Sequence, residues 1–154
     1  MKGTTLAIST SLDELAAYVE AFTARRGFDD IAATLGLIPH AADGTSISLR
    51  MPLQDALAQA NGMYSAAALF GAADITGTFL AMQAYAESEQ FPLAVQSNQN
   101  YLSNSKAEYA VAVARVLRGG GRVAVVEVSV ADADGRLLMH ATFTYVLSGR
   151  ALGR

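Results

Sequence analysis

The chain has no cysteine and no tryptophan among its 154 residues. The absence of cysteine excludes disulfide bonds, thiol nucleophiles and Cys-ligated zinc. Histidine is scarce as well. His40 and His140 are the only two, and neither an HxH nor an HxxxH spacing joins them, so we expect no metal site.

Charged residues are few, at 16% against 52% hydrophobic residues, and the net charge is −3. Because there is no basic stripe, we expect no nucleic-acid partner. The apolar excess suffices for one well-buried domain and leaves apolar surface for a partner subunit. The first ten residues, MKGTTLAIST, have no long apolar run. We therefore expect no signal peptide and a cytoplasmic protein. The long apolar stretch described next is too rich in alanine, glycine and polar groups to span a membrane.

One long stretch of the chain carries almost no charge. Between Ala56 and Ala86 the only charged residue is Asp74, and helix-forming alanine, leucine and methionine dominate. We predict one helix over residues 64–84 that is apolar nearly all round and therefore buried on several sides. A lone carboxylate is costly to bury in such a helix, so Asp74 is either held by structural partners or catalytic.

Two shorter helices are predicted before this stretch. A capping box, apolar residues at helical spacing and a terminal glycine predict a helix over residues 11–26. A second short helix is predicted to start at Asp29 or Asp30 and to end before Gly36. We interpret residues 1–36 as a helical extension that forms a lid or an outer layer.

The other segments alternate apolar and polar residues with the period of two that is typical of strands. In the last strand, Leu137, Met139 and Tyr145 are expected to face the core together. In the strand over residues 106–118, Ala110, Ala112 and Ala114 form a small-residue face that suits close packing against the helix. The order predicts an α+β domain over residues 1–154, in which a curved antiparallel sheet wraps around a single helix. The expected pieces are a hairpin over 37–51 with a turn at 43–44, strands over 93–102, 106–118, 122–132 and 136–147, turns at 87–90, 103–105, 119–121 and 134–135, and a frayed tail over 148–154.

This order of elements resembles the hotdog fold. The helix sequence SAAALFGAAD is similar to the HGGxxxxLAD signature of PaaI-like acyl-CoA thioesterases. NQNYLSNSK resembles the asparagine-rich strand and turn of that family, and GGGRVAVVEVSVADADGRLL resembles its last hairpin. The resemblance covers about residues 45–147. It implies a hotdog core over residues 37–147 and hydrolysis of acyl-CoA or acyl carrier protein thioesters.

The resemblance also implies roles for particular residues. The catalytic acid of the family corresponds to Asp74, and its oxyanion-binding glycine corresponds to Ala66, where the backbone N–H matters. The amide that positions water or the thioester corresponds to Gln59. Thr78, one turn after the acid, matches a hydroxyl found in some branches. Coenzyme A enters only as part of the substrate, and no separate cofactor is implied.

The sequence departs from the signature at several positions. Ser65 replaces the histidine, Ala66 and Ala67 replace the glycine pair, and Ala94 aligns with a serine used by some relatives. These replacements favour an alternative, a non-catalytic acyl-CoA-binding or structural hotdog dimer. A hotdog dehydratase is a poor option because its catalytic histidine is absent.

Further candidates for substrate binding each have a plain structural alternative. The side-chain amides of the predicted strand 93–102 either line the pantetheine tunnel or make hydrogen bonds on the face of the sheet that is turned toward the helix. The arginines beside the glycine turn either contact coenzyme A phosphates at a subunit edge or are ordinary surface residues. Asn61, an amide close to Gln59, either takes over the role of Gln59 or caps the loop. The candidate substrate-binding residues are Asn61, Ser65, Ala67, Asn98, Asn100, Arg118 and Arg122.

The spacing within the central helix constrains the mechanism. The N-terminus of a buried helix offers free N–H groups and a positive dipole end for an oxyanion, and Asp74 can act as a base or a nucleophile. Ala66 and Asp74 are separated by eight residues, about 12 Å along the axis, so one carbonyl carbon cannot react with both. If both act, the site is shared by two antiparallel helices of a homodimer, as in hotdog relatives. A dimer of dimers, a homotetramer, is a further option.

Overall fold

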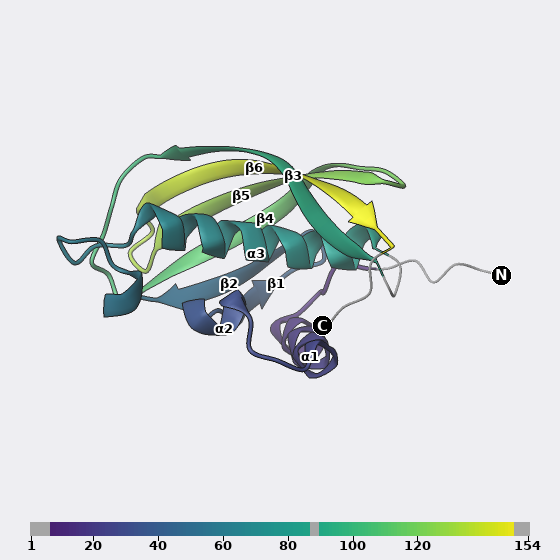
Figure 1. Cartoon of the computed structure of the whole chain (residues 1–154), viewed down its shortest axis with the longest axis horizontal. Helices are drawn as coiled ribbons and strands as arrows, with labels where there is room; N and C mark the ends of the chain where they lie inside the picture. Colours follow the sequence, from purple (N-terminus) through teal and green to yellow (C-terminus); the bar gives the residue numbers. More distant parts are fainter. Residues whose placement is uncertain (1–6, 87–89, 150–154) are drawn as a thin grey trace.

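The computed structural model describes residues 7–86 and 90–149 (Figure 1). A 20-residue helix, α3 (Ala66–Tyr85), lies inside a curved six-stranded antiparallel sheet, so the predicted α+β architecture is confirmed. The other elements are α1 (Leu12–Arg26), α2 (Ile31–Leu35), β1 (Ile38–Ala42), β2 (Ser46–Pro52), a short 3₁₀ helix (Asp55–Leu57), β3 (Phe91–Tyr101), β4 (Tyr109–Gly119), β5 (Val123–Asp132) and β6 (Leu137–Ser148).

Helix α3 begins two residues later than predicted. Ser65 has extended backbone dihedrals, and its hydroxyl accepts a hydrogen bond from the Ala68 N–H at 3.1 Å. A serine in this position is a helix cap rather than a helical residue, so Ala66 is the first residue of the helix. Buried residues occur all round α3, as its even apolar composition predicted.

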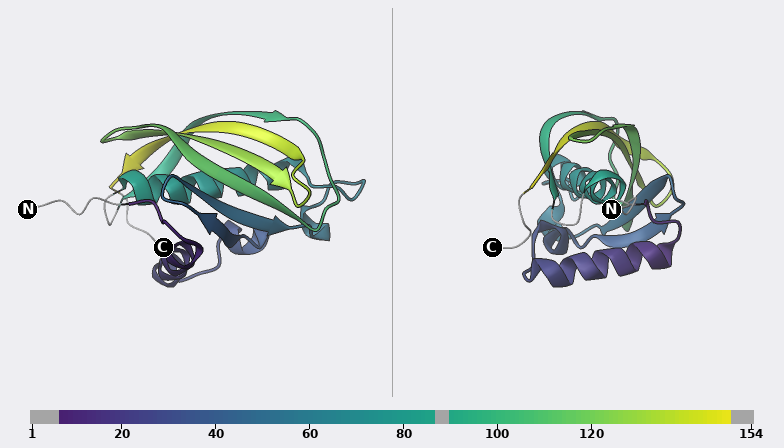
Figure 2. Two further views of the ribbon diagram at one scale, coloured as in Figure 1. Left: turned by 180° about the vertical axis from the view of Figure 1, so that it is seen from behind. Right: turned by 90° about the vertical axis from the view of Figure 1, so that its right-hand side faces the viewer.

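The order of strands in the sheet is β1-β2-β4-β5-β6-β3. Strand β3 pairs with β6 at the far edge rather than with β4, the next strand in sequence. The turn predicted at residues 103–105 is therefore wrong: the segment links two strands that are not neighbours and crosses from one edge of the sheet to its interior. Its anchors include the Leu102 N–H, which donates to Leu138 O, and the Asn104 side chain, which donates to Tyr64 O. With β3 on this edge, strands lie on both sides of α3 (Figure 2).

The residues of β4 and β6 that face the core can be compared with the alternating sequence pattern. Ala110, Ala112 and Ala114 of β4 are buried and the strand packs on α3, which confirms the small-residue face. In β6 the prediction for Leu137 is wrong. Leu137 is 42% exposed, whereas Leu138 and Met139 are both buried, because the β5–β6 register shifts at this point. An extra residue in one strand moves every residue beyond it to the other face.

Helices α1 and α2 confirm the two predicted N-terminal helices. Ser11 accepts a hydrogen bond from the Glu14 N–H at 3.2 Å, and Gly27 ends α1 with a φ of 74°. The Asp30 carboxylate caps α2 by accepting from the Ala32 N–H at 2.9 Å. Local capping thus fixes the limits of both helices.

Helix α2 packs on α3, and α1 lies mainly against β1 (Figure 2). The ring of Phe22 from α1 packs edge-on against Phe79 of α3 at 5.1 Å, and it stacks with Phe91 of β3 at 6.5 Å. Leu35 of α2 lies so close to Gly71 that a Cβ there would come within 2.9 Å of its methyl carbon. The extension is therefore an outer layer that shares the core.

Some expectations concern residues beyond this description. Most of the turn predicted at 87–90 and most of the frayed tail predicted at 148–154 lie outside the described residues. Ser148 itself ends β6, where its hydroxyl donates to Phe91 O at 3.1 Å. In the described part of the chain, no helix has the length and apolar character needed to cross a membrane.

Candidate active site

Asp74 lies in the middle of α3 and is bound by a buried tyrosine. The hydroxyl of Tyr145 in β6, a fully buried residue, lies 2.9 Å from the Asp74 backbone oxygen and 3.1 Å from its Oδ1 and donates toward both. Burial raises the pKa of Asp74, and the hydrogen bond from Tyr145 opposes this rise. A carboxyl pKa that moves toward neutral pH suits a general base.

The surroundings of Tyr145 keep its hydroxyl protonated. Burial and the charge of Asp74 raise the pKa of Tyr145, so the hydroxyl remains a donor. The Thr78 side chain opposes this rise in pKa and lies near the same hydroxyl. Gly77 leaves room for it, since a Cβ at this position would lie 2.5 Å from the Tyr145 oxygen. Asp74 and Tyr145 are thus hydrogen-bonded to each other with Thr78 beside them, and we call these three residues the Asp74 cluster.

Sequence analysis did not identify Tyr145. Its alternating pattern placed this residue among the core positions of the last strand, and it is indeed buried. The available signal was that a buried tyrosine hydroxyl needs a hydrogen-bonding partner. The partner is 71 residues away in the chain, so the pattern could not indicate which group it would be.

An apolar cavity of about 280 Å³ lies beside the Asp74 cluster. Helices α1, α2 and α3 and strand β3 contribute its walls, and Asp74 and Thr78 are among the few polar side chains that line it. Neither Gln59 nor Ala66 lines this cavity. The structure thus brings Asp74 and Thr78 together and leaves the other two predicted catalytic residues apart from them.

The N-terminal end of α3 has a different character. Ala66 and Ala67 are exposed, and their N–H groups donate to no acceptor among residues 7–86 and 90–149. Gln59 is exposed too, and its amide lies 3.4 Å from Tyr64 O. Asn61 accepts a hydrogen bond from the Met63 N–H at 3.2 Å, which is loop capping. This end of the helix therefore presents free backbone donors to solvent.

The remaining predicted residues lie on the periphery. Asn98 and Asn100 are exposed and pair with Thr142 and His140 on the outer face of the sheet. The helix-facing alternative for these two asparagines is therefore wrong. Arg118 and Arg122 are exposed at the β4–β5 hairpin. Neighbouring Gly119 lies against the ring of Tyr85, so this hairpin is next to the C-terminal end of α3.

A larger, more open hollow of about 440 Å³ lies on the outer side of the sheet near His40. Its two carboxylates are engaged in turns. Asp43 accepts from the N–H groups of Thr45 and Ser46, and Asp132 accepts from that of Arg136. These backbone hydrogen bonds hold the pKa of the Asp43 carboxyl below its usual range. Within the described residues no three potential ligands gather into a metal site.

Comparisons with known proteins point to one family. The family model described as the thioesterase superfamily matches residues 61–139. No curated protein matches the sequence significantly. The chain is similar to the structure of a thioesterase family protein from Silicibacter pomeroyi, with 25% identity, 86% of this chain and 96% of that chain covered, and a TM-score of 0.75.

Two more distant structures share the fold over nearly the whole chain. A thioesterase from Haemophilus influenzae has 15% identity and a TM-score of 0.79, with 94% of this chain and 95% of that chain covered. The PaaI protein from the phenylacetic acid degradation operon of E. coli has 15% identity and a TM-score of 0.74, with 95% and 100% covered. At this identity the likeness concerns the fold alone.

Proposed function

Because the chain belongs to the thioesterase superfamily and has the hotdog fold, we propose that it hydrolyses acyl-CoA or acyl carrier protein thioesters at the Asp74 cluster. The family supports thioester hydrolysis in general. The observation that carries the assignment to this site is the Asp74 carboxylate, held by a buried tyrosine hydroxyl beside an apolar cavity.

Two groups share the chemistry of the proposed site: the Asp74 carboxylate and the backbone N–H groups at the start of α3. Tyr145 occupies Oδ1 of Asp74, which leaves Oδ2 to take a proton from water while that water attacks the thioester carbonyl. Alternatively, Oδ2 attacks directly, and water then hydrolyses the resulting anhydride. On either route a free N–H at the start of α3, that of Ala66, binds the oxyanion, and the thiolate of coenzyme A or of the carrier protein leaves. Gln59 positions the water or the thioester.

The geometry of α3 supports a site shared by two chains. Ala66 and Asp74 are eight residues apart in this helix, about 12 Å along its axis. The Ala66 N–H of one protomer and the Asp74 carboxylate of its partner meet at one carbonyl only if two helices lie antiparallel in a homodimer. A dimer of dimers would preserve this arrangement.

The edge strand β3 offers a surface for such a dimer. It is 11 residues long and pairs on one side only, with β6. Val95 is 60% exposed and Tyr101 is 45% exposed on this strand. The buried Oε1 of Gln99 has no hydrogen-bond partner among the described residues. A long strand that pairs on one side only is stabilised when another chain pairs with its free edge. A buried acceptor without a partner suits a contact that the single chain does not supply.

The exposed candidates belong to the outer part of the substrate. Arg118 and Arg122 are exposed at the β4–β5 hairpin, and we propose that they lie at a subunit edge and bind the phosphates of coenzyme A. The groups proposed to contact the pantetheine arm or the thioester are Asn61, Ser65, Ala67, Asn98 and Asn100. The hydroxyl of Ser65 already caps α3, so its contribution would be to hold the helix end in place.

The test is steady-state release of free thiol from a panel of acyl-CoAs, with Asp74→Asn as the paired variant. Hydrolysis that depends on Asp74 is the expected result. The loss of the signature histidine and glycine pair favours one alternative, a non-catalytic acyl-CoA-binding dimer. Binding of acyl-CoA without thiol release would establish that alternative and overturn the proposal.

A further inference from the structure

The cavity beside Asp74 runs along one face of α3. Asp74, Thr78 and Met82 all line it, and residues four apart lie above one another on a helix, so the three span about 12 Å. Strand β3 forms the facing wall over a similar stretch. Ala94 lies opposite Tyr145, at the level of Asp74, and Phe91 comes three residues earlier in the strand. One end of the cavity is thus the proposed catalytic acid, and the other is formed by Met82 and Phe91.

The N-terminal helices close the far end and shape the rim. Phe22 of α1 packs on Phe79 and stacks with Phe91, and it is only 5% exposed. Met82 is equally well buried. By contrast, two apolar side chains that line the cavity are open to solvent: Ile31 of α2 is 59% exposed and Leu93 of β3 is 36% exposed. The cavity therefore has a closed aromatic end and an open apolar rim.

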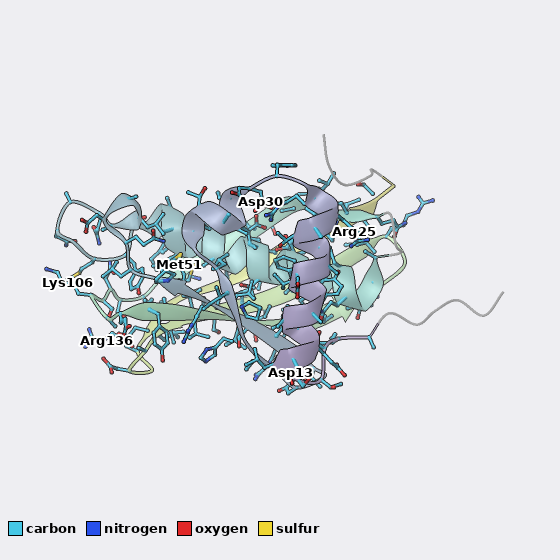
Figure 3. All side chains as sticks on the ribbon, turned by 90° about the horizontal axis from the view of Figure 1, so that it is seen from below. Asp13, Arg25, Asp30, Met51, Lys106 and Arg136 are labelled. Atoms are coloured by element: carbon cyan, nitrogen blue, oxygen red, sulfur yellow. The ribbon has the colours of Figure 1, made fainter. Side chains whose placement is uncertain are left out.

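The charges around the cavity select against anionic groups. The carboxylate of Asp30 is engaged by Arg26 at 2.8 Å and by the Ala32 N–H, so Arg26 offers no free cation (Figure 3 shows Asp30 where α1 meets α2). Among the residues that the structure describes, no lysine, arginine or histidine lines the cavity. A carboxylated acyl group would be buried beside Asp74 without a counter-charge, which is costly.

The size of the cavity limits what can enter. Its volume of about 280 Å³ is at or below the lower end of the ~300–1,000 Å³ range of ligand pockets, so it can take an acyl group and not coenzyme A. A carbon chain advances by less than its ~1.5 Å bond length per carbon, so roughly 12 Å accommodates about eight to ten carbons.

We propose that α1 and α2 close an acyl-binding pocket along α3, that this pocket takes uncharged acyl groups of up to medium length, and that Phe22 at its closed end sets the length. The inference rests on the proposed thioesterase function for its reaction, but the pocket can be tested by binding alone. It makes the N-terminal extension a part of the substrate site. It also names Phe22 and Ile31 as specificity-determining residues.

The first experiment measures kcat/KM for saturated acyl-CoAs of increasing length, from acetyl to palmitoyl, together with glutaryl-CoA. We expect kcat/KM to rise to about eight to ten carbons and then to fall, and glutaryl-CoA to react at least ~10-fold more slowly than pentanoyl-CoA, its uncharged counterpart of equal length. Phe22→Ala should move the optimum to longer chains, because it removes the ring at the closed end.

The control for Phe22→Ala is Leu15→Ala, which also removes a fully buried side chain from α1 but does not line the cavity. It should leave the optimum unchanged. If Phe22→Ala does not fold, Phe22→Leu serves as the milder change. An unchanged optimum in the folded Phe22 variant, or an equal shift in Leu15→Ala, would overturn the role of Phe22.

The second experiment separates the pocket from the reaction. Octanoyl-CoA and coenzyme A are titrated by calorimetry into the Asp74→Asn variant, with and without Ile31→Asp at the exposed rim. We expect octanoyl-CoA to bind at least ~10-fold more tightly than coenzyme A, and Ile31→Asp to remove most of that difference. Equal affinities would overturn the pocket even if thioesters are hydrolysed. Preferential binding without any hydrolysis would leave the pocket standing and reject the proposed enzyme.

Discussion

The middle of helix α3 and its N-terminal end are eight residues apart and are built in opposite ways. In the middle, Asp74 is bound by Tyr145, which is 71 residues away in the sequence, and burial raises the pKa of Asp74. At the N-terminal end, Ser65 and Asn61 make their hydrogen bonds to backbone groups two or three residues away. The N–H groups of Ala66 and Ala67, which follow Ser65, face solvent.

In the proposed mechanism, this difference means that neither region is a complete site. The middle supplies a carboxylate in an apolar setting, whereas the end supplies backbone donors. The helix axis keeps the two about 12 Å apart, so in one protomer they cannot act on one carbonyl. The two regions also affect the stability of the fold in opposite ways. The buried carboxylate in the middle lowers the stability, whereas the cap at the N-terminal end raises it.

Replacement of the acid should have the largest effect on activity. Asp74→Asn should lower kcat/KM by ~10²–10⁴-fold, the range attributed to a positioned general base. Steady-state kinetics on the best acyl-CoA of the panel will measure this change. Unchanged turnover would show that Asp74 is only structural.

The same variant should be more stable than the parent at neutral pH. The folded-state pKa of Asp74 is raised above its ordinary value, so between these two pKa values the folded state binds more protons than the unfolded state. Stability then falls as the pH rises through this window, and the loss is complete above the folded-state pKa. Asn removes this loss. Thermal unfolding should give a higher Tm for Asp74→Asn at pH 7, and the difference should shrink as the pH falls below the ordinary carboxyl pKa.

Two inactive variants should restore one another if the two regions act across a dimer. Asp74→Ala and Gln59→Ala would each damage both sites of their own homodimer. A mixed dimer would contain one doubly damaged site and one intact site. With random pairing about half of the dimers are mixed, so about a quarter of all sites should be active.

Co-expression with two affinity tags isolates the mixed dimer, which should have about half the activity of the parent dimer. Each tagged homodimer serves as its control. If the mixed dimer is no more active than these homodimers, Asp74 and Gln59 do not serve one shared site.

Loss of the tyrosine hydroxyl should have an intermediate effect that depends on pH. Its hydrogen bond holds the pKa of Asp74 down, so Tyr145→Phe should raise this pKa further. The acid limb of the kcat/KM profile should then move to higher pH. Gly77→Ala should shift the limb in the same direction, because its methyl group would displace the Tyr145 hydroxyl.

The matched control is Tyr64→Phe. Tyr64 is also fully buried, and its hydroxyl donates to Ala107 O at 2.9 Å, away from the Asp74 cluster. It should lose comparable stability and keep the parental pH profile. The same profile in Tyr145→Phe and the parent would show that Tyr145 only packs the core.

The smallest effect is expected at the helix cap. Ser65→Ala should cost about 0.5–2 kcal/mol of stability, the usual loss for an N-cap. Chemical denaturation measures this loss, and Ser65→Asp, which can still cap the helix, serves as the control. Because the hydroxyl is already used by Ala68, kcat should change little. A large fall in kcat without loss of stability would indicate that Ser65 contacts the substrate.

The sequence alone determined the features that depend on near neighbours. Capping partners lie two or three residues apart, so the helices beginning at Leu12 and Ile31 could be placed within two residues. The run of helix-forming residues placed the helix beginning at Ala66 equally closely, although its cap was not recognised. The period-two pattern located the strands. The run without charge from Ala56 to Ala86 identified Asp74 as an unusual residue. Each signal is short in range because helical and strand periodicities and caps repeat within a few residues.

Only the tertiary structure decided the contacts between distant segments. It placed β3 beside β6, introduced the bulge that buries Leu138, and set the Tyr145 hydroxyl against Asp74. It also joined α1, α2, α3 and β3 into one cavity. Strand order and register depend on which surfaces pack best once the chain is folded, and no pattern within one segment reports the partner of that segment. The acid could therefore be found in the sequence, but the groups that bind it and shape its pocket could not.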